Sequence, residues 1–445
     1  MTRFDPSGPL RGSLRPPADK SISHRAALIA AMAEGETRIQ GYLDAADTRS
    51  TLAAVAGLGA RVEAGRDLAS ELRIQGVGLR GARPAAIDVG NAGTLLRLLP
   101  GWLAGQESGE WTLDGDDSIR QRPVDRIAAP LREMGADLSC RDDRLPPLEI
   151  RGSALRGFEY ELPVASAQIK SCLLFAGLLA EGETRIVEPL PTRDHSERML
   201  AAAGASVRRE DSPGDGAAAD AAPGGGTVVI APADRLEVDR IVVPADLSSA
   251  AFVVVASLLV GGSEVLMHGV GLNPTRIGLL SVLERMGAEI EATPTGDQGG
   301  EPIGDLRIVA SELRATEVGG AEVPLAIDEL PLVALAACFA AGTTTIRDAS
   351  ELRRKESDRI ATVSDALNAL GGQVEANADG MVVTGTGGLR GGAIDSHGDH
   401  RIAMLGAVAG LASREGVEVH GMDAAAVSYP GFEVDLASLL GPGRI

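Results

Sequence analysis

Three lysines stand out among the residues that could do chemistry in this chain. Of its 42 lysine and arginine residues, only Lys20, Lys170 and Lys355 are lysines. A lysine ammonium is a compact charge that can lose its proton when it is removed from water, whereas a guanidinium stays charged. Coding bias explains each lysine alone, but it explains their three placements together less well. We therefore treat the segments around them as candidate functional segments.

Arginines gather near the same segments. Arg25 follows Lys20 closely, and Lys355 stands inside Arg353-Arg354-Lys355-Glu356-Ser357-Asp358-Arg359. The other candidates are Arg97, Arg120, Arg122, Arg193 and Arg401. Each of them taken alone is equally well explained as a solvated surface arginine. If they converge in space, they form a site for a ligand that carries phosphate and carboxylate groups.

Two acids, Asp328 and Glu356, stand among these cations. Nearby cations lower a carboxyl pKa and burial raises it, so a proton-transfer role needs the two influences in balance. A structural ion pair is the alternative. His400 could cap a helix, bind an anion or move protons. The loop Asn91-Ala92-Gly93-Thr94 could present backbone N–H groups to an anion, with Gly93 allowing close approach, although Asn and Gly also mark ordinary turns.

The composition excludes several classes of protein. A net charge of −20 leaves no basic face for nucleic acid, and 2% aromatic residues give no stacking platform. The longest apolar run, residues 250–260, is too short to cross a bilayer, and no signal peptide is expected at the start. The spacing of Cys140, Cys172 and Cys338 fits neither a metal site nor a disulfide framework. We expect a cytoplasmic globular protein.

The hydrophobic pattern repeats six times. Each copy has a first helix that is apolar on nearly all sides, which predicts burial, and a second helix with a polar face. First helices are predicted over residues 23–33, 95–103, 166–179, 250–260 and 332–341 and after Asp399. Second helices are predicted over residues 47–58, 124–134, 193–203, 357–370 and 432–440, with one more ending before Gly287. Glycines 59, 135, 204, 287 and 371 follow the second helices, as expected for left-handed helix ends.

The openings of the first helices carry side chains that could cap the helix or favour an anion. They are Lys20 or Ser21, Asn91, Ser166, Asp246, Asp328 and Asp399. A helix N-terminus also carries partial positive charge and unpaired N–H groups, which favour an anionic ligand. For Asp246 capping alone is a sufficient explanation. Capping does not explain why basic residues are concentrated at the same places.

The repeats and the chain length predict an α/β protein with two domains, because 445 residues exceed one ordinary core. Pro16-Pro17 precedes the first copy, and Val243-Pro244 separates the third from the fourth. One domain is therefore predicted from residues 1–17 and 245–445, and the other from residues 18–244. The low-complexity stretches 211–226 and 294–304 are predicted to be surface loops without chemistry.

Motifs distributed over nearly the whole chain resemble those of the EPSP synthase (3-phosphoshikimate 1-carboxyvinyltransferase) family. In chain order they are Asp19-Lys20-Ser21-Ile22-Ser23-His24-Arg25, Gly90-Asn91-Ala92-Gly93-Thr94, Arg122-Pro123, Ser166-Ala167-Gln168, Lys355-Glu356-Ser357-Asp358-Arg359 and Asp399-His400-Arg401. Two further segments, 166–171 and 192–195, are similar to the more divergent bacterial class of this family.

The resemblance implies an inside-out α/β barrel of six βαβαββ repeats, three in each of two domains that close like a clamp. It implies transfer of the enolpyruvyl group of phosphoenolpyruvate to the 5-hydroxyl of shikimate 3-phosphate, by addition to a tetrahedral intermediate and elimination of phosphate. Those two small molecules are the expected partners. Metal, cofactor, nucleic acid and membrane are not expected, and the chain should be a monomer.

The resemblance also assigns expected roles to residues. Shikimate 3-phosphate should be held by Lys20, Ser21, Arg25, Ser166, Ala167, Gln168, Arg193, Asp328 and Lys355. Phosphoenolpyruvate should lie against Lys20, Gly93, Arg122, Gln168, Arg359, His400 and Arg401. The catalytic residues should be Lys20, Asp328 as acceptor of the 5-hydroxyl proton and Glu356 as the group that protonates the methylene carbon.

Two departures from the family pattern and two alternatives stay open. Many members have a lysine two residues before the aromatic of a C-terminal Phe-Pro or Tyr-Pro pair, and Val427 stands there in this chain. Lys170 has no counterpart in the better-known class. UDP-N-acetylglucosamine enolpyruvyl transferase shares the implied fold, but its usual reactive cysteine is missing from residues 113–122. A silent anion-binding module is disfavoured by Asp328 and Glu356, which would repel an anion.

Overall fold

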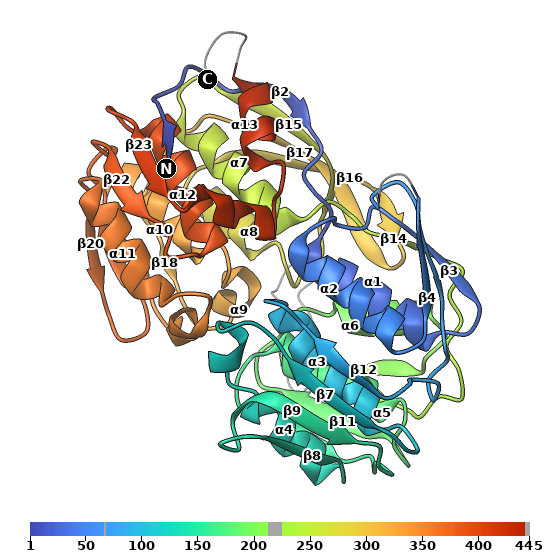
Figure 1. Ribbon diagram of the computed structural model, residues 1–445. Helices are drawn as coiled ribbons and strands as arrows, with labels where there is room; N and C mark the ends of the chain where they lie inside the picture. The colour runs from blue at the N-terminus through green and yellow to red at the C-terminus, as the bar shows by residue number, and fades with distance from the viewer. Residues whose placement is uncertain (66–67, 212–224, 441–445) are drawn as a thin grey trace. The chain divides into compact units, whose positions relative to one another are not determined.

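The structure is a computed structural model that describes residues 1–65, 68–211 and 225–440. The chain forms two compact units, shown in Figure 1. Unit 1 comprises Met1–Pro17, Ala245–Gly296 and Pro302–Ile445, and unit 2 comprises Ala18–Pro244 and Asp297–Glu301. Each unit has its own buried hydrophobic core, so each has the internal packing expected of a domain.

Unit 2 contains three four-stranded sheets within its described residues. In strand order they are β14 (Arg240–Val242)–β3 (Glu36–Gln40)–β5 (Leu72–Gln75)–β4 (Arg61–Ala64), β6 (Ala85–Asp88)–β7 (Glu110–Asp114)–β9 (Leu145–Arg151)–β8 (Asp137–Arg141) and β10 (Glu159–Glu161)–β11 (Thr184–Glu188)–β13 (Gly226–Ile230)–β12 (Val207–Asp211). The first pair of each sheet is parallel, and the two following pairs are antiparallel. One topology therefore occurs three times in this unit.

Unit 1 contains two four-stranded sheets and one three-stranded sheet within its described residues. Their orders are β16 (Glu289–Gln298)–β17 (Glu301–Val309)–β15 (Glu264–Gly271)–β2 (Arg11–Leu14), β18 (Glu317–Val318)–β19 (Thr343–Ile346)–β21 (Met381–Thr384)–β20 (Gln373–Ala376) and β1 (Thr2–Phe4)–β23 (Val417–His420)–β22 (Gly392–Asp395). Each sheet again has a parallel pair at one edge, namely β2–β15, β18–β19 or β22–β23. The N-terminal strands β1 and β2 complete sheets of this unit.

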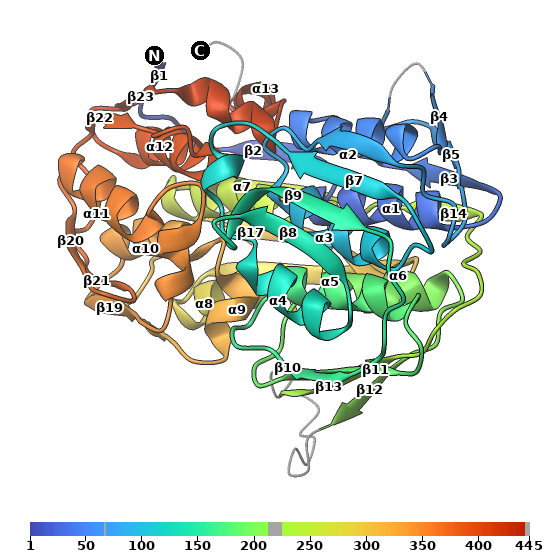
Figure 2. The ribbon, with the colours of Figure 1, turned by 60° about the horizontal axis from the view of Figure 1, so that its bottom comes forward.

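Three buried helices form the centre of unit 2: α1 (Lys20–Met32), α3 (Gly93–Ala104) and α5 (Ala167–Gly177). Each contacts strands of its own sheet, and α3 also packs along α5. Figure 2 shows α5 between α3 and the β10–β13 sheet. Their sequences are apolar on most sides because neighbours cover them on most sides, as predicted.

Unit 1 has an equivalent trio, α7 (Leu247–Leu259), α10 (Leu330–Phe339) and α12 (His400–Ala412), whose members contact one another. Helix α7 contains Val253-Val254-Val255, a run that disfavours a helix because β-branched side chains lose rotamer freedom there. All three valines are fully buried, so tertiary packing outweighs intrinsic propensity. No described helix combines the length and apolar character needed to span a bilayer.

The second helices of the repeats have one buried face. They are α2 (Ala46–Gly57), α4 (Asp125–Glu133), α6 (His195–Ala202), α8 (Gly278–Arg285), α11 (Arg359–Ala369) and α13 (Phe432–Leu439). The glycines that follow the first five have φ between 89° and 107°. A side chain is rarely tolerated in that region, so the predicted left-handed helix ends are confirmed. Shorter helical segments are η1 (Ile119–Gln121), α9 (Glu322–Ala326), η2 (Ser350–Arg354) and η3 (Met422–Val427).

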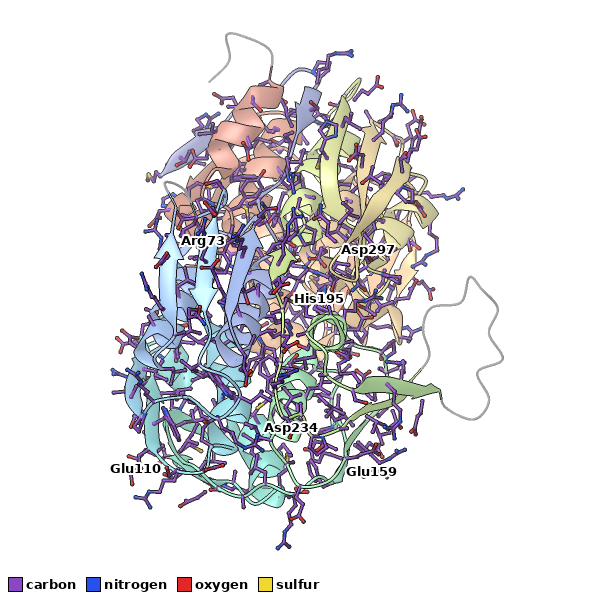
Figure 3. All side chains as sticks on the ribbon, turned by 90° about the vertical axis from the view of Figure 1, so that its right-hand side faces the viewer. Arg73, Glu110, Glu159, His195, Asp234 and Asp297 are labelled. Carbon is purple, nitrogen blue, oxygen red and sulfur yellow. The ribbon has the colours of Figure 1, made fainter. Side chains whose placement is uncertain are left out.

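The sheets of unit 2 turn alternate residues outward. On β7, Trp111 and Leu113 are buried, whereas Glu110 is exposed. Glu110 pairs with Arg151 on β9 at 3.0 Å, and Glu159 pairs with Arg185 on β11 at 3.1 Å. Figure 3 shows Glu110 and Glu159 at the outer surface of the unit. Such exposed pairs add little stability, about 0–1 kcal/mol each, and mainly keep the acidic surface solvated.

The prediction of a surface loop at residues 294–304 is wrong. Residues 294–304 belong to the hairpin of β16 and β17, in which Gly299 and Gly300 form the turn with φ of 65° and 87°. Two consecutive residues with positive φ match the twist of a tight hairpin, so the glycine content marks a turn rather than a flexible loop. Most of the other stretch, residues 211–226, lies outside the described residues.

Candidate active site

Helix α1 positions Lys20 at its first turn. The Asp19 side chain caps the helix by accepting a hydrogen bond of 2.8 Å from the Ile22 backbone, so Asp19 is the cap and Lys20 and Ser21 follow it in the first turn. Lys20 Nζ lies 3.1 Å from Oδ2 of Asp47, a buried residue near the start of α2. The Lys20 ammonium is therefore held by an acid while its side chain stays 22% exposed to a ligand.

Arg25 is a buried cation whose hydrogen bonds go to neutral oxygens. It is 3% exposed and donates from Nε to Ser196 Oγ (2.7 Å), from Nη1 to the Ser21 carbonyl (3.0 Å) and from Nη2 to Ser171 Oγ (2.9 Å). Burial lowers its pKa to about 10. Because a buried charge normally requires an opposite charge, Arg25 is well suited to bind an anionic group.

His24, in the same motif, is a buried neutral group. Its Nδ1 lies 2.6 Å from Thr51 Oγ1, and burial lowers its pKa to about 3 from an ordinary 6.5. At a pH between these two values, His24 is therefore protonated in the unfolded chain and neutral in the folded chain. The free energy of unfolding is expected to fall by about 1 kcal/mol per pH unit from this group as the pH drops below 6.5.

Denaturant unfolding between pH 6.5 and pH 4 measures this contribution. The slope of the unfolding free energy against pH gives the number of protons taken up on unfolding. This number should be smaller by about one in His24→Asn than in the natural chain. The control is His397→Asn, because His397 is exposed. Equal slopes for His24→Asn and the natural chain would contradict a neutral, buried His24.

The start of α3 brings two guanidinium groups to Gly93. A Cβ atom at this glycine would lie 2.8 Å from Arg122 Nη1 and 3.0 Å from Arg97 Nη1. Arg122 Nη2 donates to Asn91 Oδ1 at 3.0 Å, and Arg97 Nη1 donates to the Gly93 carbonyl at 3.1 Å. Asn91 therefore orients Arg122 and does not cap α3, which begins after Ala92 without a side-chain cap. Two cations here face the backbone of a helix N-terminus.

Helix α5 begins beside α3. The Ser166 side chain caps α5 as predicted, accepting a hydrogen bond of 3.4 Å from the Ile169 backbone. Gln168 Nε2 donates to Thr94 Oγ1 at 3.4 Å, which links the first turns of α5 and α3. Ala167 is the first residue of α5, and Arg193 lies in the segment before α6 with a partly exposed side chain.

In unit 1, one buried guanidinium binds three carboxylates. Arg359 is 1% exposed, and its Nη2 lies 2.5 Å from Glu356 Oε2. Its Nε lies 2.8 Å from Asp399 Oδ2, and its Nη1 lies 3.4 Å from Asp328 Oδ1. Lys355 Nζ also contacts Asp328, at 3.1 Å. Burial alone would lower the pKa of Arg359, but Glu356 and Asp399 outweigh it, so its pKa is raised.

Asp399 connects this cluster to the start of α12. Its Oδ1 accepts a hydrogen bond from the Arg401 backbone at 2.9 Å, as the predicted cap does. Burial opposes ionisation, but Arg359 outweighs it and holds the pKa of Asp399 below its usual range. His400 follows as the first residue of α12, buried, with Nδ1 3.9 Å from Asp399 Oδ1.

A second buried acid, Glu329, orients Arg401. Glu329 accepts hydrogen bonds from Ser248 and from Arg276 Nη1, the latter at 3.0 and 3.1 Å. Arg401 Nη1 lies 3.4 Å from Glu329 Oε1 and 3.1 Å from the Asp328 carbonyl oxygen. The first turns of α7, α10 and α12 therefore meet through these contacts. Asp328 does not cap α10, because Glu329 occupies the cap position without a side-chain cap.

The two units divide the predicted site residues between them. Unit 2 contains Lys20, Ser21, Arg25, Gly93, Arg122, Ser166, Ala167, Gln168 and Arg193, whereas unit 1 contains Asp328, Lys355, Glu356, Arg359, His400 and Arg401. The polar residues that hold the cations were not predicted from the sequence. They are Asp47, Ser171, Ser196, Glu329 and, as a partner of Arg359, Asp399. Their signal is a polar residue inside an otherwise apolar buried helix, as Ser171 shows.

Each unit therefore carries helix N-termini with clustered cations, a feature that suits anionic ligands, and unit 1 adds two acids. A sequence profile of EPSP synthase (3-phosphoshikimate 1-carboxyvinyltransferase) matches residues 4–436. A relative of that name from Synechococcus sp. (strain JA-3-3Ab) is 48% identical over 99% of this chain and 96% of its own length. Another, from Methylococcus capsulatus, is 46% identical over 98% of this chain and 96% of its own.

Solved structures agree with the sequence comparison. An EPSP synthase from Acinetobacter baumannii matches with a TM-score of 0.85 and 39% identity, covering 99% of this chain and 98% of the other. The chain belongs to the EPSP synthase family. The resemblance seen in the motifs is confirmed, as is the mixed α/β class. The chain is an enzyme that transfers the enolpyruvyl group to shikimate 3-phosphate in aromatic biosynthesis.

The alternative acceptor, UDP-N-acetylglucosamine, is not favoured by these comparisons. The positions of the cysteines agree with this. Cys172 and Cys338 are buried in α5 and α10, and Cys140 lies on β8. Burial raises the pKa of the Cys140 thiol, so the reactive thiolate is disfavoured.

Proposed function

We propose that Asp328 and Glu356 are the acid–base pair of enolpyruvyl transfer in this chain. The observation that carries the proposal is their common contact with the buried guanidinium of Arg359. Both side chains stay partly exposed, at 13% and 28%, so a substrate can reach them. A preorganised cluster of charges of this kind can stabilise the cation-like carbon that develops during the reaction.

The proposed chemistry balances over two steps. In the addition, Asp328 takes the proton of the 5-hydroxyl, the oxygen bonds to C2 of phosphoenolpyruvate, and protonated Glu356 gives its proton to C3. In the elimination, Glu356 takes a proton back from the new methyl group, and the bond between C2 and the phosphate oxygen breaks. Asp328 returns its proton to the departing phosphate, so both acids regain their starting state. Positioned acid–base groups typically contribute about 10²–10⁴-fold to such a rate.

The proposed binding residues form two sets, one for each substrate. Arg25, Arg193, Lys20 and Lys355 are proposed to hold the anionic groups of shikimate 3-phosphate, with Ser21, Ser166, Ala167, Gln168 and Asp328 at its hydroxyl and phosphate oxygens. Lys20, Arg122, Arg359 and Arg401 are proposed to bind phosphoenolpyruvate, with Gly93, Gln168 and His400 beside it. The first set is supported by Arg25, whose buried guanidinium donates its hydrogen bonds to the neutral oxygens of Ser196, Ser21 and Ser171.

We also propose the finer architecture expected from the family. The six sheets of the described chain are six copies of one βαβαββ unit, three per domain, which together make an inside-out α/β barrel. The parallel pair at one edge of every sheet supports this arrangement, although the β1–β23–β22 sheet has three strands where the others have four. The domains are residues 1–17 with 245–445, and residues 18–244. We propose that the enzyme is a cytoplasmic monomer that needs no metal or cofactor.

A phosphate-release assay tests the proposed function. Purified enzyme should release phosphate when both phosphoenolpyruvate and shikimate 3-phosphate are present, and not with either alone. Replacing shikimate 3-phosphate by UDP-N-acetylglucosamine should give no release. Phosphate release with UDP-N-acetylglucosamine in place of shikimate 3-phosphate would overturn the assignment. So would the absence of release with both acceptors.

The family resemblance implies that glyphosate occupies the phosphoenolpyruvate position and is slightly longer than this substrate, so the geometry at Gly93 leads to a prediction about glyphosate. A methyl group at Gly93 would displace the Arg122 and Arg97 guanidinium groups. Gly93→Ala should therefore raise the Michaelis constant for phosphoenolpyruvate, at a cost of about 1–3 kcal/mol. The inhibition constant for glyphosate should rise by a larger factor.

Steady-state kinetics with competitive inhibition measures both constants. Gly57→Ala is the matched control, because a Cβ at this outer-helix glycine meets nothing within 4 Å. Equal factors for the Michaelis and inhibition constants would mean that Gly93 senses only the anion that the two molecules share. A natural enzyme insensitive to glyphosate would place the discriminating contact elsewhere.

A further inference from the structure

Lys170 is a fully buried cation within unit 2. Its Nζ lies 2.9 Å from Glu188 Oε1, 2.5 Å from Glu197 Oε1 and 3.4 Å from the Thr192 carbonyl oxygen. Burial alone would lower the pKa of Lys170, but Glu197 and Glu188 outweigh it, so its pKa is raised and the ammonium keeps its charge. These four residues are called the Lys170 node below.

The node explains why a lysine occupies this position in an arginine-rich chain. An ammonium group has three N–H donors, and three acceptors surround Nζ. A guanidinium is a planar fork with five donors and cannot direct them at three oxygens grouped around one point. The side chain of Lys170 is also completely enclosed, so the larger arginine side chain would have to displace its neighbours.

The node joins three segments that carry or adjoin site residues. Lys170 lies in the first turns of α5, and Glu188 is the last residue of β11. Thr192 directly precedes Arg193, and its Oγ1 donates to Glu188 Oε1 at 2.6 Å. Glu197 lies in α6, which begins at His195, labelled in Figure 3. Thr192, directly before Arg193, is therefore held through both its carbonyl oxygen and its side-chain hydroxyl.

The residues next to the node hold Arg25. Ser171 follows Lys170 on α5, and Ser196 precedes Glu197 on α6. Ser196 Oγ donates to Ser171 Oγ at 2.7 Å, and each hydroxyl accepts a hydrogen bond from Arg25. The spacing of α5 and α6 set by the node therefore also sets the direction of the Arg25 guanidinium.

We propose that Lys170 is a positioning residue for shikimate 3-phosphate: its ammonium fixes α5, α6 and the segment before Arg193, so that Arg25 and Arg193 face the substrate. This role rests on the proposed function of those two arginines. It predicts a larger effect on shikimate 3-phosphate than on phosphoenolpyruvate. Arg25 and Arg193 are assigned to shikimate 3-phosphate alone, only Gln168 on α5 is assigned to both substrates, and Asp328 and Glu356 lie in unit 1.

The test compares Lys170→Arg with the natural enzyme. The Michaelis constant and the dissociation constant for shikimate 3-phosphate should rise by about 10- to 100-fold, as expected when binding groups are misplaced by about 1 Å. The Michaelis constant for phosphoenolpyruvate and kcat should each change by less than about threefold, the pattern of lost substrate binding. Binding of shikimate 3-phosphate is measured by calorimetry without phosphoenolpyruvate.

Leu174→Ala is the matched control for general destabilisation, because Leu174 is a fully buried apolar residue of the same helix. It should lower the melting temperature without raising either constant for shikimate 3-phosphate. If Lys170→Arg does not fold, Thr192→Val loosens the same node without unpairing a charge and should raise both constants by at least about threefold.

The outcomes separate the positioning role from the proposed function. A natural enzyme that fails to release phosphate from the two substrates overturns the function itself. A natural enzyme that works, with Lys170→Arg and Thr192→Val binding shikimate 3-phosphate normally, overturns only the role of Lys170. Equal losses in Leu174→Ala and Lys170→Arg would reduce the node to a purely structural contact.

Discussion

Glu356→Gln is expected to lower kcat by about 10²–10⁴-fold, the usual contribution of a general acid–base group. The dissociation constant of shikimate 3-phosphate should stay within about threefold of its natural value, because that substrate is assigned to other residues. The amide keeps the size of the side chain and can still accept a hydrogen bond from Arg359, but it cannot give a proton to C3. The fold should therefore persist while the chemistry fails.

Single-turnover phosphate release and calorimetric binding measure the two effects separately. The control is Glu375→Gln, which changes an exposed glutamate on β20 of the same unit and should leave both unchanged. Normal turnover in Glu356→Gln would leave Glu356 as a structural partner of Arg359. Weakened binding with normal turnover would move Glu356 from the catalytic group to the binding group.

Arg359→Met is expected to lower the free energy of unfolding by about 3–5 kcal/mol, since it leaves buried acid groups without their partner. Asp399 loses two hydrogen bonds, at 2.8 and 3.2 Å, and is itself fully buried. Asp328 and Glu356 lose their contact with the same guanidinium. Turnover should also fall, because Arg359 is proposed to bind phosphoenolpyruvate.

Denaturant unfolding measures the first effect. Arg414→Met is the control, because Arg414 is exposed in unit 1 and should change stability by less than about 0.5 kcal/mol. Restored stability in the double variant Arg359→Met, Asp399→Asn would attribute the loss to the unpaired charge. An unchanged unfolding free energy in Arg359→Met would show that water or movement of the acids replaces the guanidinium.

The elements of the fold were predictable where the pattern is periodic. The buried helix of residues 250–260 appears as α7, Leu247–Leu259, because its residues are apolar on every side. The hairpin at residues 294–304 was not predictable from composition, since glycine-rich sequence is common to loops and to tight turns. The caps at Ser166, Asp246 and Asp399 were predicted correctly, whereas those at Asn91 and Asp328 were not.

The site itself was only partly predictable. The motifs identified the cations and the two acids, but not which acid binds which cation. Lys20 pairs with Asp47, and Arg401 pairs with Glu329, in both cases across different helices. Such partners are distant in sequence, and no local pattern connects them.

By itself, the sequence determined the family, the repeated order of helices and strands, and the residue types available for chemistry, because these follow from local pattern and composition. Only the tertiary structure decided which polar groups are buried and what they touch. Arg25 resembles any other arginine in the sequence, but in the fold it is a buried cation bound to neutral oxygens. Burial and pairing set the electrostatic energy of a charge, and both arise only when distant segments pack together.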